Sequence, residues 1–253
     1  MKLTTRKEGN IYTVTINRPD VRNAVDRETA QMLHDAFLEF DRDDGLSVAI
    51  LYGEGGNFCA GADLKAVAEG TPNRLEPSGC APMGPSRLFV GKPVIAAVSG
   101  YAVAGGLELA LWCDLRVADK GAIFGVFCRR YGVPLIDGGT VRLARVVGMG
   151  RALDMILTGR AVYTEEALQM GLVNRIVDNG CCLEEANVLA RQIALFPQNC
   201  LRHDRMSVYQ SYDFNFDEAM NNEFKHGMQV ITSGETFEGA NLFKGGKGRH
   251  GTF

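Results

Sequence analysis

Hydrophobic and polar residues alternate along Ile11–Ile16, and this period of two predicts a β-strand. A helical period follows, because Asp26 is a good N-cap and Leu33, Phe37 and Phe40 recur on one face of the helix that it would begin. Apolar strands and helices then alternate along 48–52, 62–69, 94–98, 105–112 and 114–118. Strands that alternate with helices predict parallel crossover units, and therefore an α/β fold.

Beyond about residue 140 the strand pattern is sparse and the helical pattern dominates. The expected helices cover 140–147, 150–157, 164–170, 183–196, 198–209, 216–229 and 234–244. We therefore expect an α/β core over residues 1–195 and a helical C-terminal region over 196–253.

Charge and composition narrow the class of protein. The net charge of −3 over 253 residues argues against a surface dedicated to nucleic acid. No apolar run reaches the roughly 20 residues of a membrane-spanning helix, and residues 1–8 lack the apolar core of an export signal. Seven cysteines, an odd count without a CxxC pair, are typical of reduced thiols. We expect a cytoplasmic protein without a nucleic-acid or membrane partner.

Several common catalytic motifs are missing from the sequence. It contains no HExxH, P-loop, GxSxG or complete GxGxxG motif, and its four histidines show no metal-ligand spacing. Zinc proteases, nucleotide hydrolases, ordinary serine hydrolases and dinucleotide enzymes are therefore disfavoured. We predict no metal site and no permanently bound cofactor.

Two strands each lead into a turn of small residues. The loop 53–57 is followed by Ala60–Ala62, and the strand 94–98 is followed by a turn at Gly105–Gly106 and a helix. Backbone N–H groups at such turns and helix starts are unpaired and attract negative charge. One N–H from each turn would form a two-donor oxyanion hole. Glu108, one turn inside the helix, would add a carboxyl group suited to acid–base chemistry at a carbonyl compound.

The same two segments carry a family resemblance. The chain resembles the enoyl-CoA hydratase/isomerase (crotonase) superfamily in its two main motifs, FCAGADLK at 58–65 and GYAVAGGLELALWCD at 100–114. Further matches follow the same order along the chain: NRP and NA within 17–24, LTGR and GLV within 157–173, and EG with F within 238–243. The resemblance implies a spiral of repeated ββα units and C-terminal helices used for trimerisation, hence a homotrimer or a dimer of trimers. It also implies an acyl-CoA thioester substrate, with coenzyme A as part of that substrate.

The resemblance assigns roles residue by residue. Ala60 and Gly105 would hold the thioester oxygen through their backbone N–H groups, and Glu108 would be a catalytic acid–base residue; a dipole-stabilised acid at a helix start is the alternative for Glu108. The residues that would contact coenzyme A are Arg22, Ala62, Asp63, Leu64, Lys65, Phe243 and Lys247.

Cys128 departs from the hydratase pattern. Hydratases of the family carry a second Glu at this position, shortly after a Phe-Gly pair, and a thiol with a pKa of about 8.5 is a poor general acid or base. Two interpretations stay open: a nucleophile activated by Arg129 and Arg130, or a small semi-buried residue. The two arginines would pair with a carboxylate, or they would be solvated.

Asp137 is the candidate replacement for the missing acid. It lies between an apolar stretch and a predicted helix, so a helix N-cap is the competing interpretation. Some members of the family that act on dienoyl-CoA use an Asp near this position. We therefore expect Glu108 and Asp137 to be the acid–base pair.

The favoured function is addition of water to 2-enoyl-CoA thioesters. A double-bond isomerase acting on enoyl- or dienoyl-CoA and a weakly catalytic acyl-CoA-binding protein are the alternatives. The Pro- and Gly-rich stretch 70–85 is expected to be a long loop, either a cover over the acyl chain or a mobile surface segment.

Overall fold

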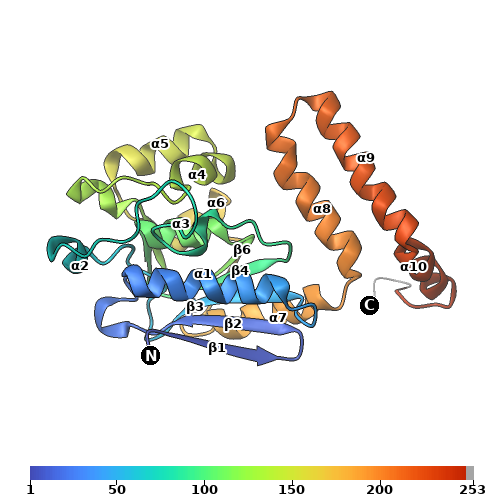
Figure 1. Ribbon diagram of the computed structural model, residues 1–253, viewed down its shortest axis with the longest axis horizontal. Coiled ribbons are helices and arrows are strands. Elements are labelled where there is room, and N and C mark those ends of the chain that lie inside the picture. The colour runs from blue at the N-terminus through green and yellow to red at the C-terminus, as the bar shows by residue number, and fades with distance from the viewer. Residues whose placement is uncertain (249–253) are drawn as a thin grey trace. The chain divides into compact units, whose positions relative to one another are not determined.

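In the computed structural model, which describes residues 1–248, six strands form a larger sheet (Figure 1). Their order is β1 (Leu3–Glu8), β2 (Ile11–Ile16), β3 (Val48–Gly53), β4 (Val94–Val98), β6 (Leu115–Asp119) and β9 (Arg175–Val177). β1 and β2 pair antiparallel, and the later neighbours pair in parallel. Every residue of β4 and all but one of β3 are buried, as expected for apolar runs inside a parallel sheet.

A second, smaller sheet contains β5 (Tyr101–Val103), β7 (Ile123–Gly125) and β8 (Val162–Tyr163). β4, β5 and the following helix form one ββα unit, and β6, β7 and a later helix form the next. In each unit the first strand joins the larger sheet and the second joins the smaller one. The predicted α/β spiral of repeated ββα units is therefore confirmed.

Two strands, β8 and β9, lie beyond residue 140, where the sequence pattern predicted mainly helices. The strands β5 and β7, earlier in the chain, were not predicted either. These strands have only two or three residues, so they are too short to display a period of two.

Ten α-helices accompany the strands in the described part of the chain. They are α1 (Arg27–Arg42), α2 (Leu64–Ala68), α3 (Gly105–Trp112), α4 (Gly139–Val147), α5 (Met149–Thr158), α6 (Thr164–Gln169), α7 (Cys182–Ala194), α8 (Gln198–Gln210), α9 (Phe216–Ser233) and α10 (Glu235–Lys244). Short 3₁₀ helices occur at η1 (Pro19–Val21), η2 (Pro85–Arg87), η3 (Phe127–Tyr131) and η4 (Ser211–Asp213). Among residues 1–248, no helix combines the length and the apolar character needed to cross a membrane.

The chain divides into two compact units, Met1–Arg191 and a second that begins at Gln192. The last five residues of the predicted region 196–253 lie outside the described part. In the second unit, α8 and α9 pack side by side around the short η4 (Figure 1). Asn215 starts α9 with a capping box that it forms with Glu218.

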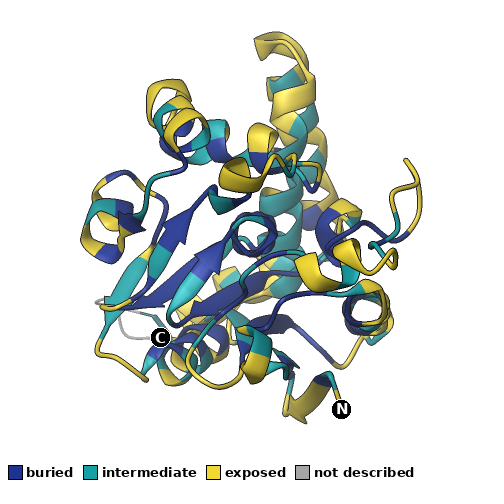
Figure 2. Ribbon diagram, turned by 90° about the vertical axis from the view of Figure 1, so that its left-hand side faces the viewer, coloured by how far each residue is buried: buried dark blue, intermediate teal, exposed yellow. Residues whose placement is uncertain are grey.

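In the first unit, the helix starts and buried faces follow from local sequence. The Asp26 carboxylate accepts the N–H of Thr29 (2.8 Å) and so begins α1, whose Leu33, Phe37 and Phe40 are fully buried. Figure 2 shows the central strands buried, the edge strand β1 mostly exposed and the outer helices exposing one side. All residues of α3 are buried, so Glu108 is an acid on a helix with no solvent face.

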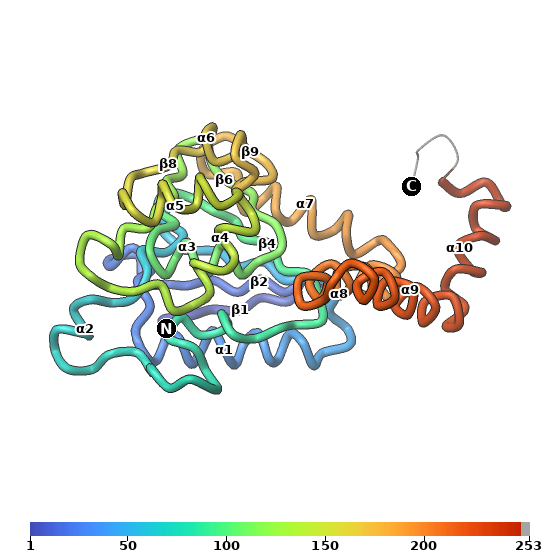
Figure 3. Tube along the Cα trace, turned by 90° about the horizontal axis from the view of Figure 1, so that it is seen from above, coloured from blue at the N-terminus to red at the C-terminus, as the bar shows by residue number. Residues whose placement is uncertain are grey.

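The irregular segment between α2 and η2 is only partly a surface loop. α2 and the chain that follows it lie at the periphery of the first unit (Figure 3). Residues 74–79 are mostly exposed, whereas residues 80–86 are buried. The second half of the segment is therefore anchored in the core, which argues against a surface loop over residues 80–86.

Candidate active site

The two small-residue turns meet as the sequence predicted. Three backbone hydrogen bonds join them: Phe58 N–H to Ser99 O (2.7 Å), Cys59 N–H to Tyr101 O (2.8 Å) and Val103 N–H to Cys59 O (3.1 Å). The approach is so close that a Cβ on Gly106 would lie 2.0 Å from Cys59 O. Glycine at the start of α3 is therefore a requirement of this contact.

The loop before the first turn is held by Asn23. Its side-chain amide donates to Glu54 O (2.8 Å) and Asn57 O (2.6 Å), while its Oδ1 accepts the N–H of Arg18 (2.8 Å). Asn23 is completely buried, so these bonds form without competition from solvent. They position the Ala60–Ala62 turn against α3.

The structure revises which backbone groups of the turns are available. The N–H of Ala60, a predicted oxyanion donor, donates to Arg22 O at 3.0 Å and has no hydrogen left for a ligand. The N–H groups of Ala62 and Gly105 have no acceptor within residues 1–248. A Cβ on Gly61 would lie 2.9 Å from Gly105 N, so the two free donors are near neighbours. Ala62 therefore replaces Ala60 as the available partner of Gly105.

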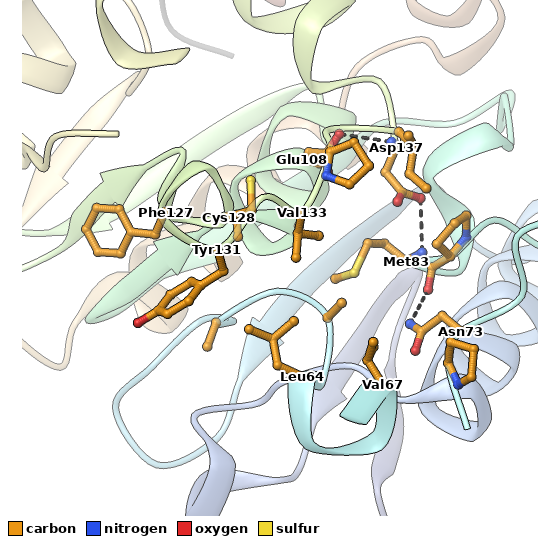
Figure 4. A pocket seen from close by; sticks show the side chains of 18 of the residues that line it. Leu64, Val67, Asn73, Met83, Glu108, Phe127, Cys128, Tyr131, Val133 and Asp137 are labelled. Atoms are coloured by element: carbon orange, nitrogen blue, oxygen red, sulfur yellow. Dashed lines mark hydrogen bonds between the residues drawn. The ribbon is translucent and has the colours of Figure 1, made fainter. Parts of the chain in front are cut away.

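These donors open into a pocket of about 490 Å³ in the first unit (Figure 4). Its lining is mainly apolar and comes from the turn at 60–64, α2, the segment 72–83, the start of α3, η3 and the chain before α4. The polar side chains that line it are Asn73, Glu108, Cys128, Tyr131 and Asp137. An apolar pocket with a few converging polar groups is the usual form of a small-molecule site.

Glu108 projects from α3 into this pocket and is 3% exposed. Its Oε1 accepts two backbone N–H groups, from Asp137 (2.9 Å) and Gly139 (2.8 Å). Burial, which disfavours the charged form, raises the pKa of the carboxyl from 4.5 to about 7, and the nearby Asp137 charge adds to this effect. A carboxyl with such a pKa gives and takes a proton near neutral pH.

Asp137 is also buried, and its Oδ1 accepts the N–H of Met83 (3.0 Å) and the hydroxyl of Ser86. Burial raises the pKa of this carboxyl, while those two hydrogen bonds act in the opposite direction. The competing interpretation as a helix cap is wrong, because Gly138 is the N-cap of α4 and no side chain caps that helix.

The two acids lie on one wall of the pocket (Figure 4). In each, one oxygen is held by hydrogen bonds, whereas Glu108 Oε2 and Asp137 Oδ2 have no partner among the described residues. Neither of these two oxygens is completely buried. Two oriented carboxyl groups thus offer a free oxygen each.

Cys128 lines the same pocket, but as a neutral thiol. Burial and the nearby Glu108 raise its pKa, and the opposing effect of Arg129 is smaller. Arg129 donates to Ile156 O (3.2 Å), while Arg130 donates to Gly159 O (2.8 Å) and stacks on the Phe127 ring. Neither arginine pairs with Glu108 or Asp137. Because the pKa of the Cys128 thiol is raised despite Arg129, the activated-nucleophile interpretation loses its support.

The residues predicted to contact coenzyme A divide into three groups. Ala62 and Leu64 line the pocket, and Lys65 and Arg22 are exposed near its turn. Asp63 is buried instead, where it caps α2 and pairs with Arg18 (2.9 Å), so the structure gives it a supporting role. Phe243 and Lys247 belong to the second unit.

Three polar groups of the site were not predicted from the sequence. Asn73 and the backbone of Met83 line the pocket, whereas Ser86 lies behind it and donates to Asp137. All three come from the Pro- and Gly-rich stretch or the turn that follows it. Composition marked this stretch as irregular, but it carried no pattern that singled out these positions.

Comparison with known proteins identifies the family of this chain. The model of the enoyl-CoA hydratase/isomerase family matches residues 6–245. Enoyl-CoA hydratase EchA19 of Mycobacterium tuberculosis is 34% identical, over 94% of this chain and 91% of that protein. Carnitinyl-CoA dehydratase of Salmonella typhi is 36% identical, over 94% and 93%. The crystal structure of enoyl-CoA hydratase EchA1 from Mycobacterium marinum superimposes with a TM-score of 0.91 at 35% identity, covering 96% and 95%. The chain belongs to the enoyl-CoA hydratase/isomerase family and is an enzyme of the hydratase/isomerase type.

Proposed function

We propose that this enzyme adds water to 2-enoyl-CoA thioesters, with Glu108 and Asp137 as the acid–base pair. The observation that carries the proposal is the contact between the two acids, in which Asp137 N–H donates to Glu108 Oε1 at 2.9 Å. Relatives named enoyl-CoA hydratase and carnitinyl-CoA dehydratase support a reaction that adds or removes water.

The proposed reaction begins at the thioester oxygen. The free N–H groups of Ala62 and Gly105 donate to this oxygen, which draws electrons from the conjugated double bond and makes the β-carbon electrophilic. The negative charge of the resulting enolate develops on the same oxygen. A donor of this kind contributes about 3–4 kcal/mol to transition-state stabilisation in measured cases.

The two carboxyl groups then divide the proton transfers. Asp137, supported as a carboxylate by Met83 N–H and the Ser86 hydroxyl, takes a proton from water as the water oxygen bonds to the β-carbon. Glu108, with a pKa of about 7, gives its proton to the α-carbon as the enolate collapses. Return of a proton from Asp137 to Glu108 through solvent restores the starting state, and the reverse sequence removes water.

Coenzyme A is proposed to lie along the turn that bears Ala62 and Leu64. The exposed cations of Arg22 and Lys65 suit its phosphates, and Arg22 stacks over the Tyr101 ring with 5.1 Å from its guanidinium carbon to the ring centre. The contacts of Phe243 and Lys247 with coenzyme A, and the trimer that would bring them there, stay predictions from the resemblance.

A double-bond isomerase is the second candidate. The pKa of about 7 at Glu108 favours it, because one carboxyl with such a pKa can carry a proton between two carbons without help from Asp137. Mass spectrometry of the product from a 2-enoyl-CoA separates the two reactions. Hydration adds the mass of one water, whereas isomerisation leaves the mass unchanged. Binding without any product would contradict both and favour the acyl-CoA-binding alternative.

A further inference from the structure

Asn73 is a buried polar residue in the pocket that the proposed reaction does not use. It is 4% exposed and lines the pocket together with apolar neighbours such as Val67 and Met83. Its side-chain nitrogen donates to Val25 O (3.0 Å) and to Pro82 O (2.6 Å). Its Oδ1 has no hydrogen-bond partner within the described chain.

The orientation of this amide is determined by its partners. Both partners are backbone carbonyl oxygens, which only accept hydrogen bonds, so the NH₂ group has to face them. The oxygen is thereby turned away from Pro82, to the side of the pocket where Val67 lies (Figure 4). A buried acceptor without a donor destabilises the protein, because its lost hydration is not replaced, and a donor on a ligand can remove this cost.

We infer that the pocket selects acyl-CoA thioesters whose acyl chain carries a neutral hydrogen-bond donor, such as a hydroxyl group, that reaches Asn73 Oδ1. This inference rests on the proposed acyl-CoA function and adds the substrate class. A charged ammonium group fits less well, because a single amide oxygen among apolar side chains does not offset its loss of hydration.

The chain connectivity indicates where on the substrate this donor belongs. Asn73 Nδ2 bonds to Pro82 O at 2.6 Å, and the N–H of the same peptide group belongs to Met83, which bonds to Asp137 Oδ1 at 3.0 Å. One peptide group and two hydrogen bonds therefore separate the amide from the carboxylate, a path of at most about 8 Å. Because Asp137 acts at the β-carbon, the donor lies a few bonds further along the acyl chain.

A ligand can reach Asn73 Oδ1 only after neighbouring side chains move slightly, because this oxygen is shielded from solvent. Val67 is 44% exposed on the five-residue α2, and Leu75 is 64% exposed in the segment that follows. Both line the pocket, and both have little packing to lose when an acyl chain enters.

Binding of saturated thioesters tests this inference without turnover. Calorimetry would compare octanoyl-CoA with its hydroxy derivatives on the fifth, sixth or seventh carbon, and with oxo derivatives at the same carbons, which accept but do not donate. We expect one hydroxy isomer to bind about tenfold more tightly than its oxo counterpart. A difference below about twofold for every pair would overturn the inference.

Two variants complete the test. Asn73→Leu should abolish the preference for the hydroxy isomer, and a preference that persists in it would overturn the inference. Leu75→Ala, at another lining position, should weaken all the ligands alike. If Asn73→Leu fails to fold, the comparison on the unmodified protein decides alone. Because saturated thioesters cannot be hydrated, a failure of the hydratase proposal would leave this result unaffected, and the reverse also holds.

Discussion

The backbone N–H of Asp137 donates to Oε1 of Glu108 at 2.9 Å, although the two residues lie 29 positions apart. This bond orients the Glu108 carboxyl and brings the second acid to the same wall of the pocket. It leaves one oxygen of each carboxyl free for a substrate or a water molecule. The missing Glu at Cys128 therefore does not leave the site with a single acid.

The raised pKa of Glu108 makes the stability of the fold depend on pH. The folded chain binds this proton more tightly than the unfolded chain, whose carboxyl has its usual pKa of 4.5, against about 7 when folded. Below pH 4.5 the carboxyl is protonated in both states, and its full contribution to the stability of the fold is present. The free energy of unfolding then falls by up to about 3 kcal/mol as pH rises from 4.5 to about 7. Above about pH 7 this group causes no further change.

Denaturant unfolding of Glu108→Gln at about pH 5 and about pH 8 measures this effect, because Gln has no charge at either pH. The variant should lose less stability between the two pH values than the unmodified protein. The same loss in both proteins would show that Glu108 titrates normally.

Ser86→Ala should move the pH profile of the reaction. The hydroxyl of Ser86 stabilises the Asp137 carboxylate, so its removal raises the pKa of Asp137 further. The acidic limb of the kcat/KM profile is then expected at higher pH, with the alkaline limb little changed. Ser99→Ala, which alters a buried serine outside the pocket lining, is the matched control. An unshifted profile in Ser86→Ala would argue against Asp137 as the base.

Two adjacent glycines at the start of α3 should respond differently to alanine. In Gly106→Ala the new Cβ meets the backbone oxygen of Cys59 at 2.0 Å, which cannot move alone, so we expect a loss of about 1–3 kcal/mol or more in the free energy of unfolding. In Gly105→Ala the Cβ meets the flexible Met83 side chain, with Sδ at 2.6 Å, so the fold should tolerate it better. Urea unfolding of both variants tests the order, and equal losses would contradict the close approach of the two turns.

Cys128→Ala should retain most of the activity. Burial keeps this thiol protonated near neutral pH, and the proposed reaction does not involve it. We expect a rate within about tenfold of the unmodified protein, whereas loss of an acid–base residue typically costs about 10²–10⁴-fold. A larger loss would mean that Cys128 takes part in the chemistry. Alkylation of Cys128 should also be slow at neutral pH and accelerate as pH rises.

Sequence patterns predicted the larger elements of the fold well, but not its smaller sheet. The buried runs that became β3 and β4 are long enough to show their character, and Asp26 marks the start of α1. β5, β7 and β8 have two or three residues each and owe their extended form to pairing with one another. The spiral was therefore predicted from the family resemblance and not from periodicity.

The candidate site, like the fold, could be predicted from the sequence only in part. Glu108, Asp137 and Gly105 were named from local sequence and resemblance, and the structure brings them to one pocket. Which N–H of the first turn is free could not be deduced, because it depends on where the Arg22 carbonyl lies. The acceptor at Asn73 depends likewise on two carbonyls, those of Val25 and Pro82, that only the tertiary fold brings together.

The most direct test follows the conjugated enoyl-thioester absorbance with crotonyl-CoA and a medium-chain 2-enoyl-CoA. The unmodified protein should remove the absorbance rapidly. Glu108→Gln and Asp137→Asn, which keep the size of each side chain, should each be slower by at least about 100-fold while still binding the thioester. Unchanged absorbance with the unmodified protein, despite binding, would contradict the hydratase proposal, and a full rate in either variant would remove that acid from the mechanism.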